Sequence, residues 1–187
     1  MKRHDDESRE LRLLFFAEAW IAFIVGAAAH FLFDAIGRWA PLGWIAPVNE
    51  SLWEHIKMAF WPTLLVDGLL NLRLPTVARR LVCTAASAWV STLLIVPLFY
   101  AYTGILGRHY LFADVAIFAV AMSAGHYVAY RIAIGPVPSR SSMLAAVGLL
   151  VSLGAALVWF TYAPPVMEVF RDSLTGAYGM GFEPEAQ

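Results

Sequence analysis

Long apolar blocks separated by short polar stretches make up most of this chain. Five blocks are each long enough to cross the hydrocarbon core of a bilayer as a helix, which takes about 20 residues. They cover residues 13–36, 51–72, 81–102, 110–134 and 142–162. Because the connections are short, consecutive spans are expected to lie antiparallel as neighbours. The pattern predicts an all-α, polytopic membrane bundle of about five transmembrane helices.

Composition agrees with this pattern. Of the 187 residues, 60% are hydrophobic and 14% are charged, whereas soluble domains have roughly 45–50% and 25%. The expected partners are therefore membrane lipids. The formal net charge of −1 gives no case for nucleic-acid binding. Cys83 is the only cysteine, which excludes an intrachain disulfide.

The positions of lysine and arginine predict the orientation. With the N-terminus inside, nine of the 13 lie in cytoplasmic segments, three in outer segments and one, Lys57, within a span. This asymmetry predicts an N-in, C-out protein. The chain divides into a cytoplasmic arm (1–12), a transmembrane domain (13–163) and an outer tail (164–187). The tail carries Arg171 and Asp172 and could fold back as a lid. Homo-oligomerisation stays open.

Residues 47–57 concentrate polar groups at the start of the second span. Glu50 and Glu54 are four residues apart, which places both on one helix face. His30 and Asp34 have the same spacing at the end of the first span. Since antiparallel neighbours bring these segments to the same depth, one imidazole and three carboxylates could converge near the outer face.

Such a set could hold a divalent cation such as Zn²⁺, which accepts imidazole nitrogen and carboxylate oxygen. The candidate metal ligands are His30, Glu50 and Glu54, and the candidate catalytic carboxylates are Glu54, Glu50 and Asp34. His55 lies about 100° around a helix from Glu54 and is expected to point elsewhere. Without a metal, the same groups could relay protons or act as a general acid and base.

The same stretch has a plain structural interpretation. Glu54 and Lys57 would then form an i,i+3 ion pair near water. Asn49 and Ser51 would cap the helix, and His30 would be a packed core residue. The spacings E-x-x-x-E and H-x-x-x-D are less specific than H-E-x-x-H, so both interpretations stay open.

A second polar layer is predicted nearer the inner face, with Glu18, Asp67, His126 and Arg131 in otherwise apolar spans. His126 and His30 should differ in depth by about 15 Å, which argues against one site that holds both. The groups could form interhelical hydrogen bonds, with Arg131 reaching the inner surface. They could also form a proton or ion path between the two layers.

Residues 48–57 read VNESLWEHIK, which resembles the V-N-E-S-V-W-E-H-L-K signature of an uncharacterised prokaryotic membrane family, a domain of unknown function. The resemblance extends to residues 30–34, to Gly125-His126 and to parts of the tail. That family often has glutamate where this chain has Asp34. The resemblance implies a multi-pass protein of the cytoplasmic (inner) membrane and points to the same residues, but it implies no reaction.

Three classes of function follow from these features. The first is a membrane-embedded hydrolase or transferase, with or without a metal, that acts on a lipid-like substrate. The second is a small ion- or proton-coupled transporter or channel, and the third is a non-catalytic scaffold. Nucleotide-binding, serine-hydrolase and H-E-x-x-H signatures are absent from the sequence. We favour the first class because the carboxylates and the imidazole are expected at one depth.

Overall fold

The computed structural model describes residues 2–181, with side chains from residue 6 onward. Four helices are long and apolar enough to cross a membrane. They are α1 (Lys2–Ala29), α5 (Val77–Leu106), α6 (Leu111–Ala133) and α7 (Arg140–Tyr162). The all-α prediction is confirmed, because the described residues contain no strand beyond one isolated bridge.

Short elements complete the bundle. The second predicted span contains α3 (Leu52–His55), α4 (Lys57–Leu70) and a 3₁₀ turn at Asn71–Arg73. The remaining elements are α2 (Leu32–Ala35) and the 3₁₀ turns Ala40–Trp44 and Glu168–Phe170. Four membrane-capable helices plus this interrupted segment come close to the predicted five spans.

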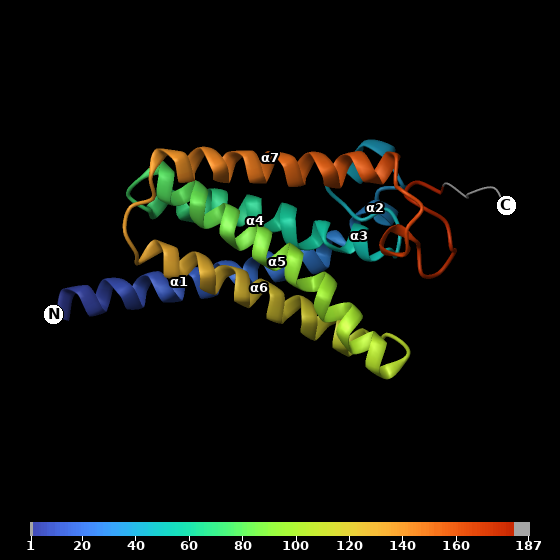
Figure 1. The fold of residues 1–187 in the computed structure, drawn as a ribbon, viewed down its shortest axis with the longest axis horizontal. Helices are drawn as coiled ribbons and strands as arrows, with labels where there is room; N and C mark the ends of the chain where they lie inside the picture. Colours follow the sequence, from blue (N-terminus) through green and yellow to red (C-terminus); the bar gives the residue numbers. More distant parts are fainter. Residues whose placement is uncertain (1, 182–187) are drawn as a thin grey trace.

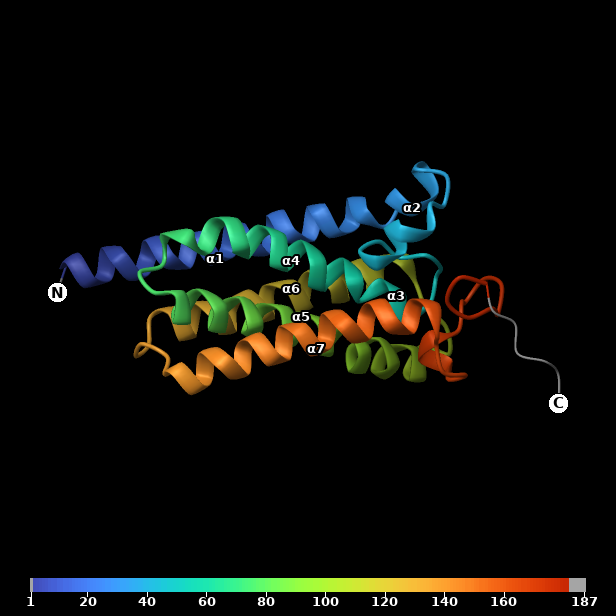
Figure 2. The same cartoon turned by 90° about the horizontal axis from the view of Figure 1, so that it is seen from above.

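The long elements run up and down in chain order (Figures 1 and 2). The N-terminus lies at one end of the bundle and the tail lies at the other, which we call the tail end. α4 packs against α1 and α5, and α5 packs against α6 and α7. Consecutive long elements therefore alternate in direction and pack together as far as α6. The expectation of neighbouring consecutive spans is wrong for α6 and α7, because α7 packs against α5 instead.

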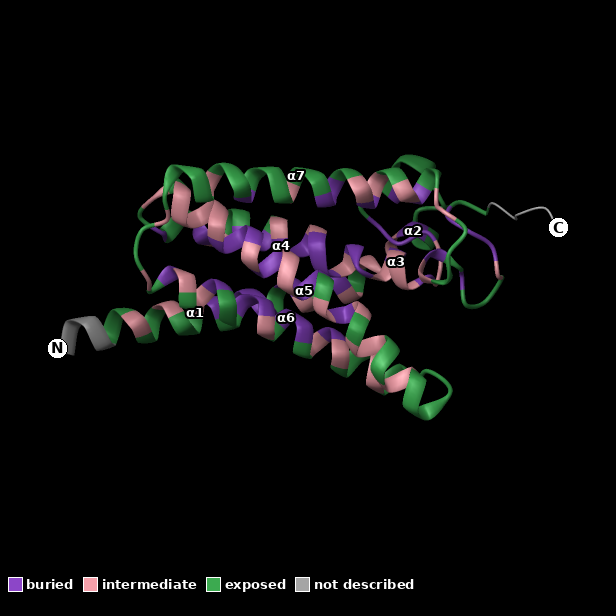
Figure 3. Ribbon diagram, in the orientation of Figure 1, coloured by how far each residue is buried: buried purple, intermediate pink, exposed green. Residues whose placement is uncertain are grey.

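α4 differs from the other long helices because it lies inside the bundle (Figure 3). Its 14 residues extend about 21 Å, short of the roughly 30 Å of a hydrocarbon core. Half of them are buried, against eight of 30 in α5. Outward-facing apolar side chains such as Val151 and Trp159 of α7 are exposed instead, as expected for a lipid-facing surface. The polar groups of α4 are thereby enclosed by protein.

The first predicted span is shorter than the sequence indicates. α1 ends at Ala29, a turn follows at His30 and Phe31, and α2 then begins. His30 and Asp34 therefore do not share one continuous helix face. The Asp34 side chain is 80% exposed and its carboxylate lies 3.7 Å from the Arg38 guanidinium.

Two glycines allow helices to approach closely. A Cβ at Gly26 of α1 would overlap the Met58 carbonyl oxygen of α4. Pro62 has no N–H for that carbonyl, which is four residues earlier in the helix. A Cβ at Gly125 of α6 would overlap Ser91 of α5. Small residues at these contacts bring the polar positions of α1, α4, α5 and α6 toward the same core.

Candidate functional site

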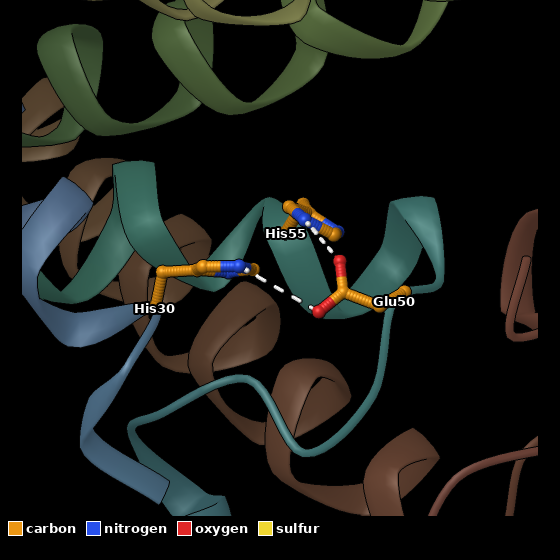
Figure 4. Close-up of side chains that lie close together, drawn as sticks. All are labelled: His30, Glu50 and His55. Carbon is orange, nitrogen blue, oxygen red and sulfur yellow. Dashed lines mark ion pairs between the residues drawn. The ribbon is translucent and has the colours of Figure 1, made fainter. Parts of the chain in front are cut away.

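His30, Glu50 and His55 meet at the tail end of the bundle, and we call them the mouth cluster (Figure 4). His30 follows α1, Glu50 precedes α3 and His55 ends α3. His30 Nε2 lies 3.6 Å from Glu50 Oε1, and His55 Nε2 lies 3.3 Å from Glu50 Oε2. One ligand atom from each residue lies within 4.8 Å of the others. Two nitrogen donors therefore accompany one carboxylate.

The orientation of His55 differs from the expectation based on helical spacing. Ser51 has extended backbone angles and caps α3, so Glu50 lies before the helix begins. The i,i+4 relation between Glu50 and Glu54 therefore does not hold on one helix face. His55, one residue further along, faces Glu50 instead.

Hydrogen bonding fixes the tautomer of His55. Its Nδ1 lies 2.8 Å from the Ser51 carbonyl oxygen, which can only accept, so Nδ1 carries a hydrogen. In the neutral ring, Nε2 then directs a lone pair at the Glu50 carboxylate, and a proton or a cation must lie between them. Histidines that bind metals commonly donate their other ring N–H to a carbonyl in this way. Donors of a tetrahedral zinc site lie about 3.3 Å apart, close to the spacings of the mouth cluster.

Charge and burial set the protonation of the mouth cluster. The hydrogen bond from His55 lowers the pKa of Glu50 below its ordinary value. Burial, together with the neighbouring His55, lowers the pKa of His30. The lowered pKa of His30 therefore favours its uncharged imidazole, which can serve as a nitrogen donor.

The mouth cluster forms part of the wall of a cavity of about 480 Å³. Most of the wall is apolar and comes from α1, α3, α5 and α6. Its apolar members include Phe23, Phe31, Leu52, Ile95 and Phe118, and its other polar members include His109, Asp114, Glu168, Arg171 and Ser173. An apolar cavity with a few convergent polar groups is the usual form of a small-molecule site.

Glu54, a candidate ligand by sequence, lies apart from the mouth cluster. Its Oε2 accepts hydrogen bonds from Lys57 Nζ at 2.6 Å and Val48 N at 3.1 Å, and its Oε1 accepts one from Thr161 Oγ1 at 2.8 Å. Lys57 Nζ also donates to the Gly43 carbonyl at 2.7 Å and to Thr161. Glu54 and Lys57 are at most 1% exposed. The ion pair suggested by the structural interpretation therefore forms, but away from water.

The C-terminal tail packs beside the mouth cluster. Asn49 Nδ2 donates to the Gly179 carbonyl at 2.8 Å, and Ser173 Oγ donates to the Glu50 carbonyl at 3.3 Å. Arg171 lines the cavity. Asp172 accepts hydrogen bonds from Leu174 and Thr175 of its own turn, and a hydrogen bond from the Glu50 backbone also lowers the pKa of its carboxyl group. The tail thus meets the start of α3 through Asn49 and Glu50, and its role as a lid stays a prediction.

The second polar layer also assembles, and we call Glu18, Asp67 and His126 the core cluster. One ligand atom from each residue lies within 4.8 Å of the others. Asp67 Oδ1 is 3.1 Å from His126 Nε2, and Asp67 Oδ2 accepts a hydrogen bond from Ser87 Oγ at 2.5 Å. Arg131 does not join them and lies with Tyr127 on the surface of α6. Ser87 gave no signal in the sequence beyond that of a small interface residue.

Residues 6–180 match the model of a family described as a family of unknown function, DUF6512. The chain belongs to this family. No curated protein and no solved structure matches it significantly. Both clusters and the cavity lie within the part of the chain that matches DUF6512. The chemistry of this DUF6512 protein must therefore be argued from its own side chains.

Proposed function

We propose that this DUF6512 protein is a membrane-embedded, metal-dependent hydrolase or transferase that acts on a lipid or another amphiphile. One observation carries the proposal: His30, Glu50 and His55 converge on the wall of an apolar cavity. Two histidines and one glutamate are a ligand set of catalytic zinc sites, where a fourth position stays open for water or substrate. The cavity supplies the space for that fourth position.

A cation held by the mouth cluster would act as a Lewis acid and activate a water molecule. The residues around it have separate tasks. The Ser51 carbonyl holds the His55 ring in its orientation. His109 Nδ1 lies 3.1 Å from Asp114 Oδ2, and both residues line the same cavity. This imidazole–carboxylate pair is the candidate general base.

The cavity suits an amphiphilic substrate. Its volume of about 480 Å³ falls within the range of roughly 300–1,000 Å³ that is typical of ligand sites. Phe23, Ile95 and Phe118 offer an apolar surface for a hydrocarbon chain. The Arg171 guanidinium, which lies 3.7 Å from the Glu168 carboxylate, offers hydrogen-bond donors for a polar head group. A lipid is therefore a better candidate than a soluble polar substrate.

Metal analysis of the full chain in detergent, after growth with Zn²⁺, is the first test. His55→Ala is expected to lose one bound metal relative to the unmodified protein. A lost ligand should weaken binding by more than the roughly 10–100-fold typical of an outer-shell change. Asp34→Asn is the matched control, because this exposed carboxylate faces Arg38. A His55→Ala protein that keeps all its metal would contradict the proposal.

Turnover is the second test. A polar lipid extract in mixed micelles is incubated with the protein, and the products are identified by mass spectrometry. Cleavage or transfer products are expected with the unmodified protein, should disappear after treatment with a chelator and should return with Zn²⁺. The His55→Ala protein should form none. Turnover that survives removal of the metal would exclude a metal-dependent reaction.

Ion- or proton-coupled transport is the second candidate function. The observation that favours it is the core cluster, because its three ionisable groups lie deeper in the same bundle than the mouth cluster. Proteoliposomes test it directly, with Zn²⁺ or protons as the transported species. Flux that is abolished by Asp67→Asn would support transport, whereas lipid turnover without flux would favour the enzyme.

A further inference from the structure

The core cluster lies in the middle of the bundle, with Glu18 on α1, Asp67 on α4 and His126 on α6. Each of these side chains is at most 1% exposed. We propose that the core cluster is a second metal site, which binds a divalent transition-metal cation independently of the mouth cluster. Its donors are one imidazole nitrogen and the oxygens of two carboxylates.

Glu18 gives the first argument. It is fully buried, and neither of its carboxylate oxygens has a hydrogen-bond partner in the part of the chain that the structure describes. A carboxylate buried without a partner is strongly disfavoured, whether it is charged or protonated. Yet Glu18 directs an oxygen to within 4.8 Å of donors from Asp67 and His126. A shared cation supplies the partner that Glu18 lacks.

The tautomer of His126 gives the second argument. Its Nδ1 lies 2.8 Å from the Met122 carbonyl oxygen, which fixes the hydrogen on Nδ1. The Nε2 of the neutral ring then faces Asp67 Oδ1 at 3.1 Å, so that two lone pairs point at each other. Only a proton or a cation between these atoms makes the contact favourable. His55 of the mouth cluster has the same arrangement, with a carbonyl four residues earlier on Nδ1 and a carboxylate on Nε2.

Charge balance gives the third argument. Glu18 and Asp67 place two acidic groups in an apolar interior, and no lysine or arginine of the described chain forms an ion pair with either. A divalent cation balances two carboxylates and a neutral imidazole. The nitrogen donor favours zinc or iron over calcium or magnesium, which prefer oxygen ligands.

The surroundings hold the donors in place. Ser87 Oγ donates to Asp67 Oδ2 at 2.5 Å and thereby orients the carboxylate. Gly125, which precedes His126, allows α6 to approach the backbone of α5. Such support around the ligands is typical of metal sites.

The two clusters are separate sites. Glu18 and His30 lie twelve residues apart, which corresponds to about 18 Å along a helix. The two metals of a shared catalytic centre lie only about 3.5–4 Å apart. A metal in the core cluster would therefore join α1, α4 and α6 without taking part in chemistry at the cavity.

Metal counting in a protein without the mouth cluster tests this proposal. The double variant His30→Ala/His55→Ala, grown with Zn²⁺ and purified as the full chain in detergent, should retain about one equivalent of tightly bound metal. Adding Glu18→Gln should abolish this equivalent, because the amide keeps the size of the side chain but loses its charge. Adding Ser91→Ala is the matched control, since Ser91 is equally buried and its neutral hydroxyl is not one of the proposed donors.

The outcomes separate this site from the proposed function. A folded double variant without metal overturns the core site, and so does a Glu18→Gln protein that keeps its metal. X-ray absorption on the metal-loaded double variant gives a reading that does not depend on the folding of Glu18→Gln. We expect a nitrogen and oxygen shell with a single imidazole, and a shell with two imidazoles or with sulfur would contradict the site.

Discussion

At the scale of single residues, the side chains of the motif at residues 48–57 have three different tasks. Glu50 and His55 belong to the mouth cluster, whereas Asn49 binds the tail. Glu54 and Lys57 form a buried lock between the start of α3, the preceding loop and α7. Neighbouring residues face different surroundings because the chain changes from extended backbone to helix at Ser51.

Removing Lys57 should destabilise the protein strongly. Lys57→Met leaves the Glu54 carboxylate buried without its counter-charge, which typically costs about 3–5 kcal/mol. The double variant Glu54→Leu/Lys57→Met should cost less, since it removes both charges. Thermal unfolding in detergent, followed by circular dichroism, measures both effects.

The exposed pair Asp34–Arg38 provides the control for this experiment. Their side chains are 80% and 68% exposed, so Arg38→Met should change stability by less than about 1 kcal/mol. If Lys57→Met were no more destabilising than Arg38→Met, Glu54 and Lys57 would not form a structural lock.

At the scale of elements, apolar block length predicted the helices but not their interruptions. α5, α6 and α7 extend at most four residues beyond the predicted bounds at each end. The break after Ala29 has no glycine or proline to announce it. The interruption at Ile56 likewise has no glycine or proline to mark it, so tertiary contacts rather than local sequence determine both breaks. The break after Ala29 and the start of α3 after Ser51 also determine the site, because they place His30 and His55 beside Glu50.

A turn around Asp172 holds the tail, and removal of the Asp172 side chain should release the tail. Asp172 accepts hydrogen bonds from Leu174 N at 2.9 Å and Thr175 Oγ1 at 2.6 Å. Burial raises the pKa of Asp172, but these hydrogen bonds outweigh it, so the pKa lies below its ordinary value. A pKa that is lower in the folded protein than in the unfolded chain means that the ionised Asp172 carboxylate stabilises the folded protein. This contribution to stability is complete above the unfolded pKa and is lost as the pH falls through the folded pKa. At neutral pH the full contribution is present.

Asp172→Ala should therefore speed chymotryptic cleavage after the buried Tyr178 at neutral pH, since the loosened tail reaches the protease more often. The rate of appearance of the shortened chain, followed by mass spectrometry, measures the effect. Ser152→Ala is the control, because this exposed residue of α7 bonds only within its own helix. Equal rates for both variants would mean that the turn does not hold the tail.

At the scale of the whole molecule, the position of each polar residue along the bundle was predictable from the sequence. The direction in which its side chain points around the helix axis was not. Helical rise placed Glu18, Asp67 and His126 in one layer and His30 and Glu50 in another, and the structure brings the members of each group together. Arg131, Asp34 and Glu54, which were predicted in these layers, lie elsewhere. The rotation of a helix about its axis depends on packing, which α4 shows best. Enclosed by the other helices, α4 buries Lys57 and Asp67, which a lipid-facing span could not do without large cost.

The orientation across the membrane remains a prediction at this scale, and it decides which side has access to the cavity. The start of α1 and the described part of the tail lie at opposite ends of the bundle (Figure 1), and the distribution of lysine and arginine predicts the tail outside. Two single-cysteine proteins in a Cys83→Ser background test this. Leu174→Cys reports on the tail and Val137→Cys on the α6–α7 connection, where both native side chains are exposed.

A membrane-impermeant maleimide should label Leu174→Cys in intact cells, because the tail is predicted outside. Val137→Cys should be labelled only after lysis, because its connection lies at the opposite end of the bundle. The reverse pattern would place the tail and the cavity on the cytoplasmic side, and equal labelling of both in intact cells would contradict a bundle that spans the membrane. The expected pattern would direct the search for a substrate to lipids and other amphiphiles of the outer leaflet.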